Sequence, residues 1–477
     1  MHLTPPSMAV GPMLQTSGIS VDRGGREVLR GVDFDLKSGE IVALTGENGS
    51  GKTTMLEACA GILPLSQGIV SRLSESGAMK ILRDYEGRRN QPPPTGLTLQ
   101  RDGICGEETV GERLEVALNV AGRSISEPTV SDVLRQWGLE HRRADRVAQL
   151  SGGQRRRLAV LCGLAPAALS GEPRVVLLDE PSEGLDKSGK ELLISWLRGL
   201  AINGHAVLVA THDQGVIDCC NRVMEVGSGT LIETAGKSEG SPSNLPEPLP
   251  AEEQSTHWAL VRWAIRMETR NPLDTIGRAA PALVALLLSY ALVGEVDMTH
   301  AGNNLLAALI LAPAFITAVV SPALTRRLAE ESCGAWWGAM IGPSARQTYS
   351  LVGASIILPL PLTYLAWAIL VDPSDLSNHS ETTRWLWLPA LIVIDIAAAA
   401  TALHLLVADL RRASAAAASL LLLVLVWPFL QLTDALSLMM TNGMSFGLSF
   451  GDPLISCLIA SLISAVVWAV AVFLPDA

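Results

Sequence analysis

Charged side chains are scarce in this 477-residue chain. They account for 17% of the residues, whereas hydrophobic ones account for 48%. Because about 25% charge is usual in soluble globular proteins, this composition excludes an ordinary soluble enzyme. The scarcity is greatest from Leu273 onward, where 205 residues contain 7 arginines, 13 acidic residues and no lysine. We therefore interpret the chain as a soluble half followed by a membrane half, which also excludes a disordered or collagen-like protein.

The chain also lacks an excess of basic residues and lacks cysteines in metal-ligand spacing, and each absence excludes a class of function. The formal net charge is −11, and a protein without an excess of basic residues is a poor ligand for a phosphate backbone, so no nucleic acid is expected as a partner. The seven cysteines are scattered, without CxxC or other metal-ligand spacing. A reduced, cytosolic setting is therefore expected for the soluble half, with no disulfide framework.

Residues 13–235 alternate between short apolar runs and helical patterns. The runs Ile41–Leu44, Val175–Leu178 and Ala206–Ala210 are bounded by polar turns, as is typical of strands buried on both faces. Strands that alternate with helices favour a parallel sheet. We predict an α/β nucleotide-binding domain over 13–235, with a mostly parallel sheet and a helical subdomain.

Two connecting segments follow. Residues 236–255 are rich in Gly, Ser, Pro and Glu, a composition that predicts a flexible linker. In residues 256–272, three arginines (Arg262, Arg266 and Arg270) recur every four positions and so share one helical face. We predict an amphipathic helix in the membrane surface; the alternative is a solvated helix packed on the soluble domain.

Residues 273–477 contain six stretches that are long and apolar enough to cross a bilayer. They are Ile276–Val296, Leu305–Leu324, Thr348–Val371, Leu386–Leu406, Ala415–Leu438 and Pro453–Leu474. Arginines gather in alternate connections (Arg326, Arg327 and Arg346, then Arg411 and Arg412), which are therefore predicted to be cytoplasmic. The expected protein is a multi-pass inner-membrane protein with an all-α membrane domain of six helices and a cytoplasmic N-terminal domain.

A phosphate-binding loop follows the first apolar run. Residues 41–54 read IVALTGENGSGKTT: a strand, a glycine-rich loop and the start of a helix, an arrangement that surrounds phosphate oxygens with backbone N–H groups. Lys52 is expected to reach the β- and γ-phosphates, and Thr53 to bind Mg²⁺. The expected ATP-binding residues of the loop are Gly46, Glu47, Asn48, Gly49, Ser50, Gly51, Lys52, Thr53 and Thr54.

Two later motifs complete this chemistry. The run 175–186, VVLLDEPSEGLD, places Asp179 at a strand end, where it can hold magnesium directly or through water, and Glu180 beside it, where it can polarise the attacking water. The run 150–154, LSGGQ, precedes a helical pattern, so its small residues can present backbone amides to a γ-phosphate. The expected contacts of this second motif are Ser151, Gly152, Gly153 and Gln154.

Together with Thr211–Asp213 (THD), these motifs resemble the ATP-binding cassette ATPases over nearly all of residues 13–235. The resemblance implies that Gln100 binds ATP and senses Mg²⁺, and that His212 contacts the γ-phosphate during catalysis. It implies that Asp186 closes a dimer in which each LSGGQ faces the other chain's phosphate loop. One cassette with six spans therefore looks like a half-transporter, expected to form a homodimer.

One position departs from the family. An aromatic side chain often stacks on adenine there, whereas this chain has SVDRGGREVL, with Arg23 near the position. A guanidinium can also stack on a base, so we expect hydrolysis with looser selection of ATP over GTP.

The membrane half resembles type-2 permease-like domains of exporters, and its second and third spans resemble the permease subunit of the bacterial cytochrome c maturation haem exporter. The resemblance implies outward movement of a hydrophobic or amphipathic substrate, with haem favoured and cytochrome c maturation proteins as partners. A haem-ligand role for His300, His379 or His404 is a weaker hypothesis, because histidines are common in loops and bundles. The alternatives are export of a lipid, peptide or drug, or an ATP-driven regulator of a membrane partner that transports nothing.

The loop Thr325–Gln347 mixes charged residues with Trp336 and Trp337. We predict a short helix that rests on the cassette near Gln100 and couples its closure to the membrane domain. The alternative is an ordinary interfacial helix.

Overall fold

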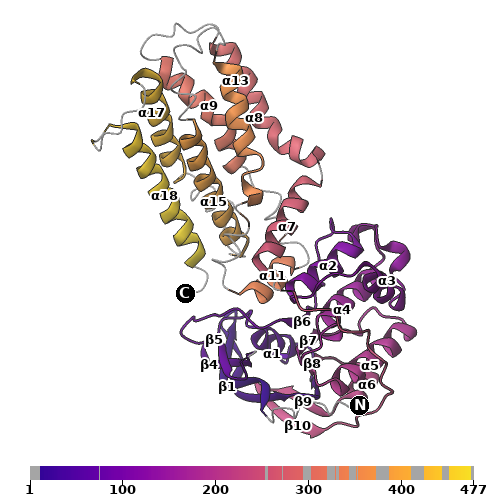
Figure 1. The fold of residues 1–477 in the computed structure, drawn as a ribbon. Coiled ribbons are helices and arrows are strands. Elements are labelled where there is room, and N and C mark those ends of the chain that lie inside the picture. Colours follow the sequence, from indigo (N-terminus) through magenta and orange to yellow (C-terminus); the bar gives the residue numbers. More distant parts are fainter. Residues whose placement is uncertain are drawn as a thin grey trace. The chain divides into compact units, whose positions relative to one another are not determined.

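The computed structural model describes residues 11–74, 76–252, 256–270, 272–293, 302–319, 328, 332–342, 351, 353–371, 386–409, 424–442, 449 and 451–473. The chain forms two compact units. The first comprises Met1–Ala259 and Arg327–Pro343, and the second comprises Leu260–Arg326 and Ser344–Ala477. Figure 1 labels their helices and strands.

The predicted parallel sheet is confirmed. The three apolar runs form β3 (Ile41–Thr45), β7 (Val175–Asp179) and β8 (Ala206–Ala210), and their residues are almost all buried. The six strands follow the order β10-β9-β3-β8-β7-β6, with β6 at Thr95–Thr98, β9 at Arg222–Gly227 and β10 at Thr230–Ala235. Because β3, β6, β7, β8 and β9 are parallel, their carboxyl ends meet at one edge, where ligands bind in such sheets.

A second, antiparallel sheet was not predicted. It has the order β2-β1-β4-β5, with β1 at Pro12–Arg23, β2 at Arg26–Lys37, β4 at Gln67–Leu73 and β5 at Met79–Asp84. Several register shifts interrupt the pairing of β1 with β2 and β4. These irregularities break the alternation of buried and exposed positions by which a strand is recognised in a sequence.

Helices cover the parallel sheet and form the predicted helical subdomain. Helix α1 (Lys52–Cys59) follows β3, and α2 (Val110–Val120), α3 (Glu127–Gln136) and two short 3₁₀ turns (Glu140–Arg142 and Val147–Gln149) lie between β6 and α4 (Gly152–Ala168). Helices α5 (Lys187–Ile202) and α6 (Gln214–Cys219) follow β7 and β8. All seven cysteines are free and buried.

Residues 236–252 differ from the flexible linker that the composition predicts. The segment lies along the cassette: Ser243 N donates to Ser195 O at 3.0 Å, and Leu249 N donates to Leu169 O at 2.9 Å. Arg123 Nη1 donates to Leu249 O at 3.3 Å, and the Leu249 side chain is buried. A polar, proline-rich segment lacks a core of its own, but its backbone groups can still be satisfied by another surface.

The helix predicted in residues 256–272 is present as α7 (Thr256–Thr269), which ends one residue before Arg270. Trp263, Ala264 and Met267 are buried, whereas Arg262 and Arg266 are exposed. The helix is therefore amphipathic, as predicted, and its place in a membrane surface stays a prediction.

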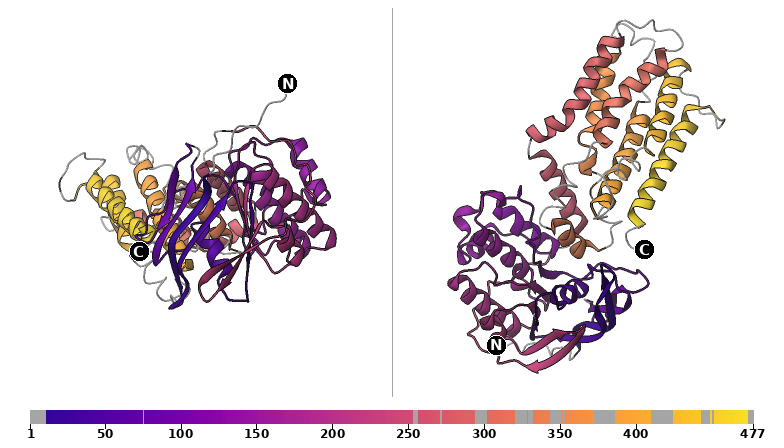
Figure 2. Two further views of the ribbon diagram at one scale, coloured as in Figure 1. Left: turned by 90° about the horizontal axis from the view of Figure 1, so that it is seen from below. Right: turned by 180° about the vertical axis from the view of Figure 1, so that it is seen from behind.

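The second unit is a bundle of helices, which run side by side in the right-hand view of Figure 2. Its described helices are α8 (Pro272–Val293), α9 (Gly302–Val319), α13 (Pro359–Leu370), α15 (Trp387–Asp409), α17 (Val426–Asn442) and α18 (Pro453–Phe473). Each overlaps one of the six predicted stretches. The arginines used to assign the cytoplasmic loops, and His300 and His379, lie outside the described residues.

Three segments are long and apolar enough to cross a membrane among the described residues. They are Gly353–Leu370, Trp387–His404 and Pro453–Val470, while Ala279–Ala291 and Gly302–Ala318 form shorter apolar helices. Helix α17 contains Gln431 and Asp434 and has 17 residues, and residues 410–423 lie outside the description. Six spans therefore remain a prediction.

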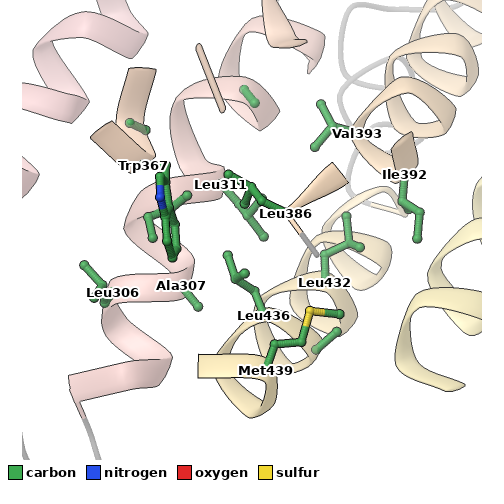
Figure 3. Packing of buried hydrophobic residues seen from close by; sticks show 14 of the residues in the cluster. Leu306, Ala307, Leu311, Trp367, Leu386, Ile392, Val393, Leu432, Leu436 and Met439 are labelled. Atoms are coloured by element: carbon green, nitrogen blue, oxygen red, sulfur yellow. The ribbon is translucent and has the colours of Figure 1, made fainter. Parts of the chain in front are cut away.

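An apolar cluster of buried residues joins these helices (Figure 3). Leu311 of α9, Trp367 of α13, Ile392 of α15 and Leu436 of α17 belong to one buried cluster. The acidic residue Asp395 of α15 is held by the Ser461 hydroxyl of α18, whose Oγ donates to Asp395 Oδ2 at 2.7 Å. This bond explains how a carboxylate is tolerated in an apolar helix.

One buried histidine makes the stability of the first unit depend on pH. His205 precedes β8, is 1% exposed, and accepts the backbone N–H of Arg174 on Nδ1 at 3.0 Å. Burial, followed by the charges of Arg174 and Arg123, lowers the pKa of His205 from 6.5 to about 4. The unfolded chain therefore binds this proton more readily than the folded one, so stability is lost as pH falls from 6.5 through 4.

We expect the free energy of unfolding of the cassette to fall by up to about 3 kcal/mol through this group between neutral pH and pH about 4. In the variant His205→Asn, the side-chain oxygen can accept the same N–H without titrating, so this contribution should vanish. Urea unfolding of the wild type and the variant across this pH range measures the free energy of unfolding of each. The difference between the two proteins isolates His205, because the acidic residues affect both proteins equally. Identical pH dependence in the two proteins would contradict the assignment.

Candidate functional site

The phosphate loop lies at the carboxyl edge of the parallel sheet, between β3 and α1. Its backbone turns sharply at Gly46, which has φ of +133° and whose added Cβ would lie 2.5 Å from Val226 O. Gly51, at φ +115°, is the N-cap of α1. Only glycine adopts both conformations without strain and leaves room for the neighbouring chain. The curled loop and the first turn of α1 thus form the predicted phosphate cradle.

Lys52 lies across this loop. Its Nζ donates to Gly46 O at 2.9 Å and to Glu47 O at 3.1 Å, and the side chain is 7% exposed. These bonds hold the ammonium at the loop, where a phosphate would meet its charge.

Two acidic residues leave the end of β7 at the same edge. Asp179 is 1% exposed, and neither of its carboxylate oxygens has a hydrogen-bond partner among the described residues. Burial raises the pKa of Asp179 to about 6, and the Thr53 hydroxyl opposes this rise, although it lies outside good hydrogen-bonding geometry. A buried carboxylate without partners is costly unless a cation neutralises it.

Asp179 and Thr53 therefore fit a bound Mg²⁺. Their oxygen atoms are of the kind that this ion prefers, and two orphaned carboxylate oxygens supply the acceptors. Gln100, the third predicted magnesium residue, lines the same cavity as Thr53. No group of three or more His, Cys, Asp or Glu side chains that could hold a metal ion occurs in the described part of the chain, this site included.

Glu180 follows Asp179 in a backbone conformation that is rare for a non-glycine residue, with φ +45°. Its N–H donates to Ala210 O of β8 at 2.8 Å, and its Oε1 lies 3.5 Å from Nε2 of His212. Such strained residues cluster at functional sites. The turn brings the two predicted catalytic residues, Glu180 and His212, together over the phosphate loop.

These groups enclose a cavity of about 830 Å³. Most predicted ATP residues line it: Asn48, Gly49, Gly51, Lys52, Thr53, Thr54, Gln100, Glu180 and His212. Gly46, Glu47 and Ser50 are not among the lining residues, although they belong to the same loop, in which Ser50 N donates to Glu47 O at 3.2 Å. The size and polarity of the cavity suit a nucleotide.

At one end of the cavity lie Arg23 and Val28, from the two strands of the first hairpin. Arg23 forms an ion pair with Glu57 of α1. The guanidinium is thus held beside the cavity, as a base-stacking role requires, and the selection of adenine over guanine stays a prediction.

Sequence reasoning missed other lining residues. Ser182, Glu183, Gly184 and Leu185 follow Glu180, the predicted catalytic glutamate, and Lys190 of α5 forms a 2.6 Å ion pair with Asp213. The signal for the pair was weak, because only Asp213 belongs to a recognisable motif and Lys190 lies 23 residues away.

The LSGGQ motif lies elsewhere on the same chain. Ser151 caps α4 and, with Gln154, forms a capping box, and Ser151 and Gly152 are exposed.

Asp186 caps α5 and accepts from Arg157 Nη2 at 2.6 Å. The N–H of Gly189 and then Arg157 lower the pKa of Asp186. The signature residues Ser151, Gly152, Gly153 and Gln154, and also Asp186, do not line the cavity.

The predicted short helix of the 325–347 loop is α11 (Cys333–Ile341), which belongs to the first unit. Trp336 is 2% exposed; its Nε1 donates to Leu97 O at 3.3 Å, and the Arg113 guanidinium lies 3.9 Å from its ring centroid. A Cβ added to Gly103 would lie 3.1 Å from Trp336 Cβ. The helix therefore lies on the cassette and contacts residues that precede and follow Gln100 in the sequence.

Two further contacts hold α11. Trp337 is fully buried and packs edge-to-face on Trp336, with ring centroids 5.2 Å apart. Arg89, from the loop after β5, donates from Nη2 to Gly338 O at 2.8 Å. The role of these tryptophans in coupling stays a prediction.

Comparisons with known proteins identify a family and several relatives of this chain. The family described as ABC transporter matches residues 29–183. A lipoprotein-releasing system ATP-binding protein LolD of Bacteroides thetaiotaomicron is 31% identical over 229 residues, 46% of this chain and 99% of that protein. An Fe(3+) ions import ATP-binding protein FbpC of Streptomyces avermitilis is 34% identical, over 46% of this chain and 62% of its own.

A macrolide export ATP-binding/permease protein MacB of Hyphomonas neptunium is 27% identical over 61% of this chain and 44% of its own. The chain thus spans about half the length of several curated relatives, with 43%, 62% and 44% covered in three of them. Among solved structures, an ATP-binding cassette bound to ADP and Pi is 24% identical, with a TM-score of 0.39, over 48% of this chain and 100% of that one.

Proposed function

Because this chain belongs to the ABC transporter family, we propose that it is an ATP-driven transporter, working as a dimer, that moves a hydrophobic or amphipathic substrate out of the cell. The observation that carries the proposal is the position of α11. This helix comes from the membrane half of the sequence, yet Trp336 is buried against the loop that carries Gln100. A change at the nucleotide can therefore reach the membrane domain through a packed contact.

The ATPase of the cassette requires ATP and Mg²⁺, and the site accounts for the hydrolysis. Thr53, Gln100 and Asp179 would hold Mg²⁺, which supplies charge neutralisation on the phosphates when bound. Glu180 is the group that orients and polarises the attacking water, and His212 contacts the γ-phosphate. Lys52 and the N–H groups of Asn48, Gly49 and Gly51 bind the phosphate chain.

The position of the signature residues supports the proposed dimer. Ser151, Gly152, Gly153 and Gln154 do not line the cavity of their own chain, and Ser151 and Gly152 are exposed at the start of α4. In the proposal these residues face the nucleotide of a second copy. Asp186, which accepts from Arg157 Nη2, is proposed to close the interface. The smallest complete unit is then a homodimer with two nucleotides.

The proposed setting is the inner membrane, with the cassette in the cytoplasm and the helices of the second unit in contact with lipids. Three described segments have the length and composition of a span, and the macrolide-export relative carries a permease in the same chain, as its name states. Export is proposed rather than import because this relative is named as a macrolide exporter.

The cargo is proposed by chemical class. The second and third predicted spans resemble the permease subunit of the cytochrome c maturation haem exporter. Haem is therefore the first candidate, with cytochrome c maturation proteins as partners. Macrolide and lipoprotein relatives favour a drug or a lipid-modified peptide instead. A regulator of a membrane partner, without transport, is the alternative of another class.

Reconstitution of the full chain in proteoliposomes tests these possibilities. We expect ATP hydrolysis to rise when one of haem, a phospholipid, a hydrophobic peptide or a macrolide is added, and that compound to cross the bilayer only with ATP. Hydrolysis that responds to none of them, but that changes when a co-purified membrane protein is added, would favour the regulator instead.

The double variant Trp336→Ala/Trp337→Ala should uncouple hydrolysis from transport. It removes the buried side chains that hold α11 but no residue that lines the cavity, so basal hydrolysis should stay within about threefold of wild type while substrate stimulation and transport are lost. Proteoliposome transport and phosphate release measure both quantities.

A matched control is Trp258→Ala, because Trp258 is 64% exposed and outside this contact; it should stay coupled. Trp336→Phe keeps a ring beside Arg113 but loses the donor to Leu97 O, so partial coupling is expected. Full coupling in the double variant would refute the role of α11.

A further inference from the structure

Arg156 makes an unusual set of buried contacts. It lies in α4, two residues after Gln154, and is 7% exposed. Its Nη1 donates to Leu99 O and to Asp102 Oδ1, both at 3.0 Å. Its Nη2 donates to Asp179 O at 2.6 Å and to Glu180 O at 2.7 Å. One guanidinium therefore joins three parts of the cassette.

The two pairs of acceptors belong to neighbouring strand ends. Strands β6 and β7 are parallel, with Thr98 opposite Leu178, so the residues that follow them leave the sheet side by side. Leu99, Gln100 and Asp102 follow β6, whereas Asp179 is the last residue of β7 and Glu180 follows it. The fork of Arg156 sets the distance between the loop that carries Gln100 and the turn that carries the proposed catalytic glutamate.

Arginine suits this place better than other side chains. Its guanidinium is planar and presents donors in a fixed geometry, whereas a lysine ammonium is a point donor and a glutamine amide has only one N–H₂ group. The burial has a cost, because Nε has no partner among the described residues and Asp102 is the single carboxylate in its ion pair. A buried charge held in this way indicates a positional role.

The main chain at Glu180 needs such support. At φ +45° it is in a conformation that non-glycine residues avoid. Its N–H donates to Ala210 O, and its carbonyl oxygen accepts from Arg156 Nη2 and from the N–H of Glu183, so both peptide groups of the residue are fixed. The direction of the Glu180 side chain follows from that conformation.

The loop that Arg156 Nη1 holds also contacts α11. Trp336 donates to Leu97 O and packs on Gly103, while Arg156 holds Leu99 O and Asp102 between them. A shift of Trp336 would thus move a short loop whose middle is tied to Glu180.

We propose that Arg156 is a positioning residue: it fixes the main chain of Glu180 against the Gln100 loop and passes the docking of α11 to the hydrolytic site. The first part concerns basal hydrolysis alone, and the second rests on the proposed transport function. The two parts are tested separately.

The first test compares Arg156→Gln, Arg156→Lys and Asp102→Asn in the full-length protein. Arg156 does not line the nucleotide cavity, so kcat for ATP should fall about tenfold or more in Arg156→Gln while KM changes by less than about threefold. Arg156→Lys should lose most of kcat as well, since one ammonium cannot span both acceptor pairs. Asp102→Asn keeps the carbonyl bonds and should show a smaller loss.

Arg123→Gln is the matched control. Arg123 is equally buried and donates to Leu249 O and Ser170 Oγ, far along the chain from the catalytic residues. It should lower the melting temperature and leave kcat per folded molecule unchanged. Wild-type kcat in Arg156→Gln, or a loss of kcat that matches the unfolded fraction as in Arg123→Gln, would overturn the positioning role. If Arg156→Gln does not fold, the other two variants decide.

The second test is a double-mutant cycle with Trp336→Ala, using substrate-stimulated over basal hydrolysis as the readout. If the path runs through Arg156, Trp336→Ala should reduce this ratio in the wild-type background and have no further effect in Arg156→Lys. Fully additive losses would overturn the relay and leave the positioning of Glu180 standing. If no substrate stimulates hydrolysis, the transport proposal and the relay fail together, whereas the kcat comparison still stands.

Discussion

The variant Glu180→Gln should bind ATP and fail to hydrolyse it. The amide keeps the size of the side chain but cannot accept a proton from the attacking water. General-base assistance and water orientation are worth about 100- to 10,000-fold in rate, so we expect kcat to fall about 1,000-fold. Phosphate release measures turnover, and binding of a fluorescent ATP analogue measures affinity.

The structure explains why affinity should survive this change. The backbone of Glu180 is fixed by Ala210 O and Arg156, and neither bond involves the carboxylate. ATP should therefore remain bound and hold the dimer closed, which size-exclusion chromatography in detergent can detect.

Glu191→Gln is a suitable control, because Glu191 is an exposed carboxylate on α5, outside the cavity. It should hydrolyse ATP at the wild-type rate. If Glu180→Gln also did so, another group would have to orient the water, and the assignment of Glu180 would be wrong.

Lys52→Ala should lose nucleotide binding. The ammonium is held over the phosphate loop by two carbonyl oxygens, so its charge is already in place when phosphates arrive. A charge pair at about 4 Å contributes about 4 kcal/mol near a protein surface. We therefore expect the Kd for ATP to rise about 100-fold or more, as titration with the fluorescent analogue would show.

Two measurements separate this loss from misfolding. The melting temperature without nucleotide should change little, because the glycine turn and α1 provide most of the loop's structure, whereas added ATP should no longer raise it. Lys80→Ala removes an exposed lysine of β5 and should bind ATP normally. Tight binding by Lys52→Ala would show that the backbone N–H groups suffice.

Much of the nucleotide site could be predicted because its parts are contiguous in the sequence. Strand, glycine loop and helix follow one another within residues 41–59, so local conformation alone builds the cradle. Asp179 and Glu180 were recognised for the same reason: they end a buried strand, and parallel strands of one sheet deliver their ends to one edge. The apolar composition of the second half likewise predicted helices in each stretch that the structure describes.

Other features depended on contacts that no local pattern records. The antiparallel sheet forms from strands with shifted registers, and residues 236–252 lie along the cassette despite the composition of a linker. Arg156 follows a motif in which it has no assigned part, and its acceptors lie 54 to 57 and 23 to 24 positions away.

The sequence by itself determined the chemistry: a chain with GENGSGKTT, LSGGQ and LLDEP binds and hydrolyses ATP, because phosphate recognition needs donors that short segments can supply. The tertiary structure alone decided how that chemistry is connected. Trp336 meets Leu97 across 239 residues, and burial of its ring on the cassette is a packing event whose free energy depends on both surfaces at once.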